Sequence, residues 1–277
     1  MRRRCSVRNR WGVRNRDGER MTRARLTSGS LLSWLIFAVL LLGWEAASRT
    51  LGLSELVLPA PSSVARSLYR GLASGFFWPH IAATLIELIV GTTLGCVIGF
   101  VVGVAMAESK RVRDVLMPYV VVSQVVPKLA LAPLFILWFG FGMTSTIVIT
   151  TLICFFPLLE NTMTALTHVA PERLELFRML DATRMQTLLR LKLPTGLPSI
   201  LAGVRVAIVL ALVGAVVGEF IGASRGLGAL VVAAQGSMDT AQMFAVLVLI
   251  ALIGMAAYRA VVSIERRLLV PYLGDRE

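Results

Sequence analysis

Long stretches without a charged residue recur along this chain of 277 residues and limit what it can fold into. Residues 88–107, for example, are 20 uncharged residues between Glu87 and Glu108. A helix of about 20 apolar residues crosses the hydrocarbon core of a bilayer, which is about 30 Å thick. Charged residues make up only 16% of the chain, against about 25% in soluble domains. The sequence therefore predicts an integral membrane protein.

The hydrophobic pattern predicts an all-α bundle of six transmembrane helices. The predicted spans cover residues 29–48, 88–107, 114–138, 144–166, 196–221 and 241–258. Prolines interrupt the third and fourth spans, at Pro118, Pro127, Pro133 and Pro157. A carbonyl that a proline frees at membrane depth must be satisfied by protein or by a water-lined cavity. Two interpretations stay open here, namely simple kinks or helices that line a translocation path.

The basic residues predict the orientation of the chain. With the N-terminus inside, 22 of the 28 Lys and Arg residues fall on the inner side and 4 fall in outer loops. The positive-inside rule then places both termini in the cytoplasm. Ten arginines lie within residues 1–26, and we interpret this segment as a membrane anchor rather than as a nucleic-acid-binding tail.

Four segments follow from this topology. We expect a basic N-terminal tail over residues 1–28, and a first helix with its outer loop over residues 29–78. A five-helix domain covers residues 79–265, and a cytoplasmic C-terminal tail covers residues 266–277.

Small residues recur at every fourth position along two of the spans. The second span carries Gly91, Gly95, Gly99 and Gly103, and the fifth carries Gly203, Ala207, Ala211 and Ala215. In lipid, helices associate largely through van der Waals fit, and small residues at this spacing let two backbones approach. We therefore predict close helix packing along both stripes. Tight packing without any further role is the plainer interpretation of the glycines.

The sequence lacks the patterns that catalysis or metal binding would need. His80 and His168 are the only histidines, and no metal-ligand spacing or nucleophile–base pair surrounds them. A phosphate-binding loop would end in Gly-Lys-Ser/Thr, but Lys110, Lys128 and Lys192 do not follow a glycine. We predict no catalytic residue, no metal site and no cofactor in this chain.

The segment between the fourth and fifth spans, residues 168–195, is polar and basic. Pro171 suits the first position of a helix that we expect over residues 171–180. Thr183 and Gln186 have the spacing of a capping box, which predicts a second helix from there to Leu193. Pro194 is expected to end that helix. The pattern fits either a surface amphipathic loop or a rigid element that docks on a partner.

The same segment carries a recognisable motif. Glu175-Leu176-Phe177 is followed after three residues by Asp181, and after nine more by Leu191-Lys192-Leu193-Pro194. This spacing resembles the EAA loop of the inner-membrane permease subunits of binding-protein-dependent ABC importers. Further matching segments are Pro127 to Leu134, Trp138-Phe139-Gly140, Gly203-Val204-Arg205, Glu219 and Gly226-Leu227-Gly228. The resemblance runs from about His80 to Arg266 and is to the sulfonate, taurine, nitrate and thiamine-precursor permeases.

The resemblance implies a fold, a function and partners. Residues 79–265 would form an ABC type-1 transmembrane domain, and residues 168–195 would hold the coupling helix, which contacts a separate ATPase subunit. The coupling residues would be Glu175, Leu176, Phe177, Asp181, Leu191, Leu193 and Pro194. The chain would be a homodimer in the bacterial inner membrane, supplied by an extracytoplasmic solute-binding protein. ATP would bind only to the partner subunit.

The chain departs from the family pattern in the loop. Leu176 and Phe177 stand where the family usually has alanines, and Asp181 stands where it usually has glycine. A glycine there would suit a left-handed turn, which aspartate tolerates at a cost of about 1–2 kcal/mol. We therefore expect the turn to persist and the surface that meets the partner to differ.

Ionisable residues within the spans are candidates for the translocation path or its gate. Pro127, Lys128, Pro133 and Glu219 are the positions that we select, with Lys128 as a possible attractor of anions. Glu219 is a candidate for a gate or a dimer contact, and structural pairing is the plainer alternative. For Arg205, we expect a structural ion pair or a lipid headgroup contact.

We thus expect a permease subunit that imports a small polar or anionic solute, such as a sulfonate, taurine, nitrate or a pyrimidine. The alternative is an ion-coupled secondary transporter with a proton relay through Glu87, Glu160 and Glu219. That alternative needs no ATPase partner, and it does not explain the segment 168–195.

Overall fold

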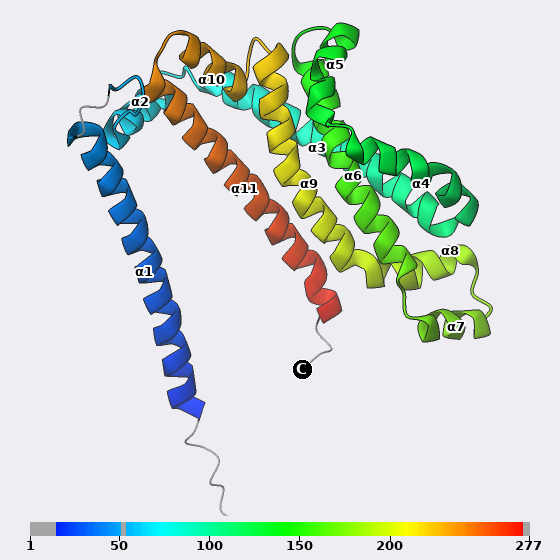
Figure 1. The fold of residues 1–277 in the computed structure, drawn as a ribbon. Helices are drawn as coiled ribbons and strands as arrows, with labels where there is room; N and C mark the ends of the chain where they lie inside the picture. The colour runs from blue at the N-terminus through cyan, green and yellow to red at the C-terminus, as the bar shows by residue number, and fades with distance from the viewer. Residues whose placement is uncertain (1–14, 51–53, 274–277) are drawn as a thin grey trace, which may run out of the picture. The chain divides into compact units, whose positions relative to one another are not determined.

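The computed structural model describes residues 15–50 and 54–273, and the elements found in these residues are all helical (Figure 1). The α-helices are α1 (Asn15–Thr50), α2 (Pro61–Ala73), α3 (Trp78–Glu108), α4 (Lys110–Val125), α5 (Ala132–Phe139), α6 (Met143–Thr167), α7 (Pro171–Met179), α8 (Arg184–Thr187), α9 (Leu193–Gly222), α10 (Leu227–Gly236) and α11 (Thr240–Leu273). A 3₁₀ turn covers Lys128–Leu131, and a π-turn covers Leu188–Lys192. The all-α prediction is confirmed for this part of the chain.

Several of these helices are long and apolar enough to cross a membrane. Among the described residues they are α3, α6, α11 and the continuous helical run Arg184–Gly222 that contains α9. Helix α4 and the segment Lys128–Phe139 form a fifth candidate, bent by 86° at the break between them. The predicted span 29–48 lies on α1, which is not in this set. Six spans therefore stay a prediction, and residues 1–14 and 274–277 of the two predicted tails lie outside the described residues.

The third predicted span is not one straight helix. Helix α4 ends at Val125, and Val126 and Pro127 have extended backbone with ψ of 124° and 99°. Proline disfavours helical backbone at the residue before it, which accounts for the end of α4 at this point. The chain resumes with the 3₁₀ turn, and Pro133 lies in the first turn of α5, where its missing N–H is tolerated.

Helix α6 lies between α3 and α9 and forms the centre of the bundle (Figure 1). The α3 glycines and the α6 residues that they face are Gly91 with Thr150, Gly95 with Cys154, Gly99 with Phe155, and Gly103 with Thr162. A Cβ atom added at Gly95 would lie 2.6 Å from the carbonyl oxygen of Thr151. The backbones of α3 and α6 thus approach so closely that only glycine fits at Gly95 without a shift.

The small residues of α9 lie against the same central helix. Gly203 faces Asn161 and Leu158 of α6, and the three alanines that follow it, Ala207, Ala211 and Ala215, are fully buried. Two of these alanines form an apolar cluster with Leu88 of α3 and Cys154 of α6. Both stripes of small residues therefore lie at contacts among α3, α6 and α9.

A short helix between the fifth and sixth predicted spans was missed by the sequence analysis. This helix, α10, follows Gly226, whose φ of 129° is a conformation that other residues rarely adopt. It packs against α9 and α11, and its Leu227 and Leu230 share a core cluster with Phe77 and Val246. Ten residues are too few to span a bilayer, so a search for membrane-spanning stretches does not detect this helix.

The chain divides into two units, residues 1–63 and residues 64–277. In the first unit, Glu45 near the end of α1 accepts hydrogen bonds from the backbone N–H and the hydroxyl of Ser62, at 3.0 and 2.9 Å. Arg49 pairs with the same carboxylate at 2.6 Å. A carboxylate at the N-terminus of α2 satisfies a backbone donor that the helix itself leaves free.

Candidate functional site

The loop after α6 folds as two short helices joined by a tight turn. Helix α7 ends in a Schellman motif, because the N–H of Ala182 donates to Phe177 O and the N–H of Asp181 donates to Arg178 O, both at 3.0 Å. Asp181 occupies the left-handed position of this motif with φ of 49°. The prediction that aspartate adopts a left-handed turn here is confirmed.

The capping box predicted for the second helix is also confirmed. The Thr183 hydroxyl accepts a hydrogen bond from the N–H of Gln186 at 3.3 Å, and the Gln186 side chain accepts one from the N–H of Thr183 at 2.8 Å. The Thr187 hydroxyl donates back to Thr183 O at 3.0 Å. These bonds fix where α8 begins, immediately after the turn at Asp181.

The prediction that Pro194 ends this helix is wrong. Helix α8 continues through the π-turn Leu188–Lys192 into α9 as one helical run from Arg184 to Gly222. Pro194 lies in the first turn of α9. Its missing N–H is tolerated because the wider π-turn replaces the regular α-helical bonds at this point.

The predicted coupling residues divide into an exposed and a covered group. Glu175, Leu176 and Asp181 are exposed, and the side chain of Phe177 is half-buried. Leu191 is buried, whereas Leu193 and Pro194 are half-buried at the start of α9. Further apolar side chains of the loop are exposed, namely Met179, Leu180, Met185 and Leu189. The helical pair thus presents a mixed apolar and charged surface on a short rigid frame.

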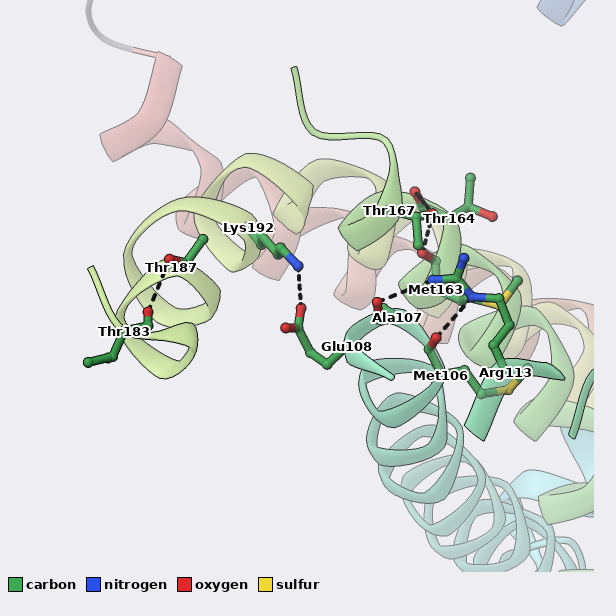
Figure 2. Close-up of polar contacts among 10 residues, drawn as sticks. All are labelled: Met106, Ala107, Glu108, Arg113, Met163, Thr164, Thr167, Thr183, Thr187 and Lys192. Atoms are coloured by element: carbon green, nitrogen blue, oxygen red, sulfur yellow. Dashed lines mark hydrogen bonds and ion pairs between the residues drawn. The ribbon is translucent and has the colours of Figure 1, made fainter. Parts of the chain in front are cut away.

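An ion pair that the sequence analysis missed ties this loop to α3. Figure 2 shows Lys192 of the π-turn facing Glu108 at the end of α3. Lys192 Nζ lies 2.6 Å from Glu108 Oε1, and the two side chains are 17% and 25% exposed. Eighty-four positions separate the two residues along the chain, so nothing in the local sequence indicates the pairing.

Arg113 of α4 closes the same end of α3. Its guanidinium donates to Met106 O at 3.0 Å and to Ala107 O at 3.2 Å (Figure 2). The last carbonyls of a helix lack partners within the helix and carry partial negative charge, so an arginine is well suited to them. The α3–α4 corner is thereby fixed beside the loop.

A cavity of about 630 Å³ lies beside the break in the third predicted span. Its walls include Pro127 and Lys128, together with Pro157, Glu160 and Asn161 of α6. Ile153 also lines the cavity, and its carbonyl has no α-helical donor because Pro157 lacks an N–H.

The charge of Lys128 is held at the edge of this cavity. Its Nζ lies 4.5 Å from the centre of the Phe156 ring, a cation–π contact that orients the ammonium group. Pro133 and Glu219 do not belong to the lining residues of this cavity. Of the four residues predicted for a path or gate, the structure therefore brings only Pro127 and Lys128 together.

Glu219 lies instead in a buried polar contact among α3, α9 and α10. Its carboxylate accepts a hydrogen bond from the Thr84 hydroxyl at 2.6 Å and another from the N–H of Gly228. Glu87 of α3 is within hydrogen-bonding reach of the same carboxylate. Glu87 also lines a separate cavity of about 470 Å³ whose wall includes Ser224 and Arg225. Glu219 thus joins α3, α9 and α10 through the hydrogen bonds of its carboxylate.

Arg205 forms the structural ion pair that was expected of it. Its Nε lies 3.0 Å from Glu265 Oε2 and joins α9 to α11. In the described part of the chain, no three His, Cys, Asp or Glu side chains lie close enough together to hold a metal ion.

Comparison with known proteins places this geometry in a family. Residues 91–270 match the family described as "Binding-protein-dependent transport system inner membrane component". The chain belongs to this family. Its members are multi-pass inner-membrane transport subunits without catalytic residues, and the ATPase of such an ABC importer is a separate subunit.

Several permeases are similar to the chain over most of their length. The riboflavin transport system permease protein RibX of Chloroflexus aurantiacus is 38% identical over 83% of this chain and 86% of its own. The formylaminopyrimidine transport permease protein ThiX of Halalkalibacterium halodurans is 36% identical over 85% and 93%. The taurine transport system permease protein TauC of Escherichia coli is 32% identical over 86% and 88%.

Solved structures of ABC transporters share the fold. One chain of the inward-facing MetNI methionine transporter aligns with a TM-score of 0.61 at 22% identity, over 70% of this chain and 97% of that chain. A chain of an amino acid ABC transporter with histidines aligns with a TM-score of 0.58 at 19% identity, over 72% and 97%. The inner-membrane component fold is thus shared well below the identity at which a substrate could be inferred.

Proposed function

We propose that this chain forms the path of an ABC importer for a small polar or anionic solute and couples passage of that solute to ATP hydrolysis on a partner subunit. The observation that carries the proposal is the loop between α6 and α9. Two capped helices of four and nine residues present exposed apolar side chains on a frame that is tied to the end of α3. Exposed apolar groups rimmed by charge are typical of a protein interface.

The exposed members of the predicted coupling set, Glu175, Leu176 and Asp181, would make the contact with the ATPase subunit. Glu175 and Leu176 lie on α7, and Asp181 holds the turn that sets the angle between the two helices. Leu191 is buried and would act from within, by holding the loop against the bundle. Phe177, Leu193 and Pro194 lie between these two groups in exposure.

The cavity beside Lys128 supports a path through the bundle. It lies where the third predicted span breaks, and irregular backbone at membrane depth is tolerated where it lines a cavity or is buried in protein. The walls carry the Lys128 ammonium, the Asn161 amide and the Glu160 carboxylate, so they would favour a polar solute, and the ammonium offers a contact for an anionic group.

The substrate class is supported by the relatives rather than by the cavity alone. Their names give riboflavin, formylaminopyrimidine, aliphatic sulfonates and taurine as transported solutes. We infer a small solute of this range, namely a sulfonate, taurine or a pyrimidine compound, and nitrate remains an expectation from the sequence motif alone.

The remaining partners follow from the same proposal. Two copies of the chain would form a homodimer with two ATPase subunits, and an extracytoplasmic solute-binding protein would deliver the solute at the outer loops. Both termini would lie in the cytoplasm, as the distribution of Lys and Arg predicts. ATP would bind only to the partner subunit.

Purification of the tagged chain in a mild detergent, followed by native mass spectrometry, tests the proposal. We expect an ATPase subunit in equal stoichiometry with the permease. A lone oligomer that persists after chemical crosslinking would contradict the proposal and favour an ion-coupled secondary transporter. Transport that stops with a proton uncoupler and continues without ATP would lead to the same conclusion.

A further inference from the structure

We propose that Glu108 and Lys192 are positioning residues that transmit movement of the coupling loop to α3. The inference rests on the proposed function, because it assigns a mechanical role to a pair beside the loop that would contact the ATPase. The two residues belong to segments that the sequence separates by 84 positions, and their side chains meet at 2.6 Å.

The location of Lys192 makes it suited to this role. Helix α7 and helix α8 project from the bundle beyond the end of α6 (Figure 1). The loop joins α6 through residues 168–170 and joins α9 through the π-turn, of which Lys192 is the last residue. Movement of α7 and α8 therefore reaches Lys192 before it reaches the membrane-spanning part of α9.

The location of Glu108 suits it to pass movement of Lys192 on to α3. Glu108 is the last residue of α3, whose glycine face packs on α6 between Ile147 and Thr162. Arg113 holds the two carbonyls that precede Glu108, and Ser109 begins α4 by accepting a hydrogen bond from the N–H of Val112 at 3.4 Å. A force on the Glu108 carboxylate is thus passed to a braced helix end rather than to a frayed one.

The π-turn supplies the compliance that such a link needs. A π-turn has wider hydrogen-bonded rings than an α-helix and often occurs at functional sites. Leu188, the first residue of the turn, and Leu193, the residue after it, pack on the cluster formed by Leu158, Leu166 and Ile200, which anchors the turn to α6 and α9. The ion pair then adds α3, so that one short segment contacts all three central helices.

The pair is suited to positioning more than to stability. Its side chains are 17% and 25% exposed, so the desolvation of the two charges offsets much of their attraction in the folding free energy. A charge reversal at either residue is checked for folding by ATP hydrolysis of the assembled complex. It should break the link, since Lys192→Glu would bring two carboxylates together and Glu108→Lys would bring two ammonium groups together.

The experiment uses the full complex of permease, ATPase subunit and binding protein in nanodiscs. Ser224 is exposed and lines the cavity of about 470 Å³ beside Glu87. It is replaced by cysteine as a reporter of this face of the permease, which the predicted topology places outside. The rate of its reaction with a membrane-impermeant maleimide is compared between the nucleotide-free complex and the complex trapped with ATP and vanadate. Neither of these two rate measurements requires the identity of the transported solute.

We expect each single reversal to reduce the nucleotide-dependent change in this rate by about five- to tenfold, the range of a modest coupling free energy. ATP hydrolysis should stay close to that of the unaltered complex. The double exchange Glu108→Lys with Lys192→Glu should restore the change, because the pair is rebuilt with its charges exchanged. Arg190→Glu is the matched control, since Arg190 lies exposed in the same π-turn and should have no effect.

Two results would overturn the inference. One is a full nucleotide-dependent change in both single variants, and the other is a double exchange that stays as defective as the single variants. The proposed function is tested separately, by copurification and ATP hydrolysis of the unaltered complex. Its failure would therefore be distinguishable from failure of the ion-pair link.

Discussion

The hydroxyl of Thr84 on α3 donates a hydrogen bond to the carboxylate of Glu219 on α9 over 2.6 Å, across 135 positions of sequence. The same hydroxyl accepts a hydrogen bond from the N–H of Leu227 at 2.9 Å, and the other oxygen of Glu219 accepts one from the N–H of Gly228. These two side chains thus satisfy the free N–H groups in the first turn of α10. One carboxylate and one hydroxyl join α3, α9 and α10.

Removal of this carboxylate should destabilise the permease. Glu219→Ala leaves the buried N–H of Gly228 without an acceptor and leaves the Thr84 hydroxyl with His80 O alone, at a cost of about 1–3 kcal/mol. For a chain of this size, that corresponds to a melting temperature lower by roughly 2–10 °C. Thermal unfolding in detergent would measure it, with Glu160→Ala, an exposed residue of the Lys128 cavity, as the control. Equal melting temperatures for the two variants would contradict the structural role of Glu219.

Replacement of Gly95 should separate α3 from α6. The added Cβ would lie 2.6 Å from the carbonyl oxygen of Thr151 and 2.7 Å from Cys154 Cβ, and a helix backbone cannot yield locally. We expect Gly95→Ala to destabilise the bundle by about 1–3 kcal/mol, and Gly95→Leu to do so by more. Gly236→Ala at the end of α10 adds the same methyl group where no atom lies within 4 Å. Unchanged thermal stability of Gly95→Ala in detergent would mean that this face of α3 does not pack against α6.

Local patterns in the sequence predicted much of the fold. The predicted fourth span, residues 144–166, differs from α6 by one residue at each end. The capping box and the left-handed turn at Asp181 were also predictable, because hydrogen bonds between residues three to five positions apart determine both.

Contacts between distant residues were not predictable in the same way. The pairing of Lys192 with Glu108 depends on how α9 and α3 pack, which no window of sequence contains. The rule that proline ends a helix fails at Pro194, because the π-turn before it replaces the regular α-helical hydrogen bonds. The hydrogen bond from the N–H of Gly228 to Glu219 was not predictable either, because it depends on α10, a helix that the hydrophobic pattern does not indicate.

The conformation of Asp181 predicts opposite effects for two substitutions. Its φ of 49° suits glycine and is unfavourable for a β-branched residue. Asp181→Gly should relieve about 1 kcal/mol of backbone strain and keep the two helices of the loop in place. Asp181→Val should break the Schellman motif and release α7 from its angle to α8. Hydrogen exchange of residues 171–187 would measure this, and equal protection in both variants would contradict the role of the turn.

Reversal of the charge at Glu175 tests the coupling surface itself. Glu175 is exposed on α7 and makes no contact that folding requires, so Glu175→Lys should insert into the membrane and fold like the unaltered chain. At the interface with the ATPase subunit, the new ammonium group would face a surface that is complementary to a carboxylate, and like charges placed together at an interface disfavour association. We expect solute uptake to fall by about tenfold or more, a loss of about 1.4 kcal/mol in coupling free energy, while ATP hydrolysis continues. Uptake and hydrolysis measured in the same proteoliposomes would give the ratio of solute transported to ATP hydrolysed.

Glu172→Lys is the control, because it is the same reversal in the first turn of α7 but lies outside the matched motif. This variant should keep most of the uptake. Normal uptake in Glu175→Lys would remove this residue from the contact with the ATPase subunit.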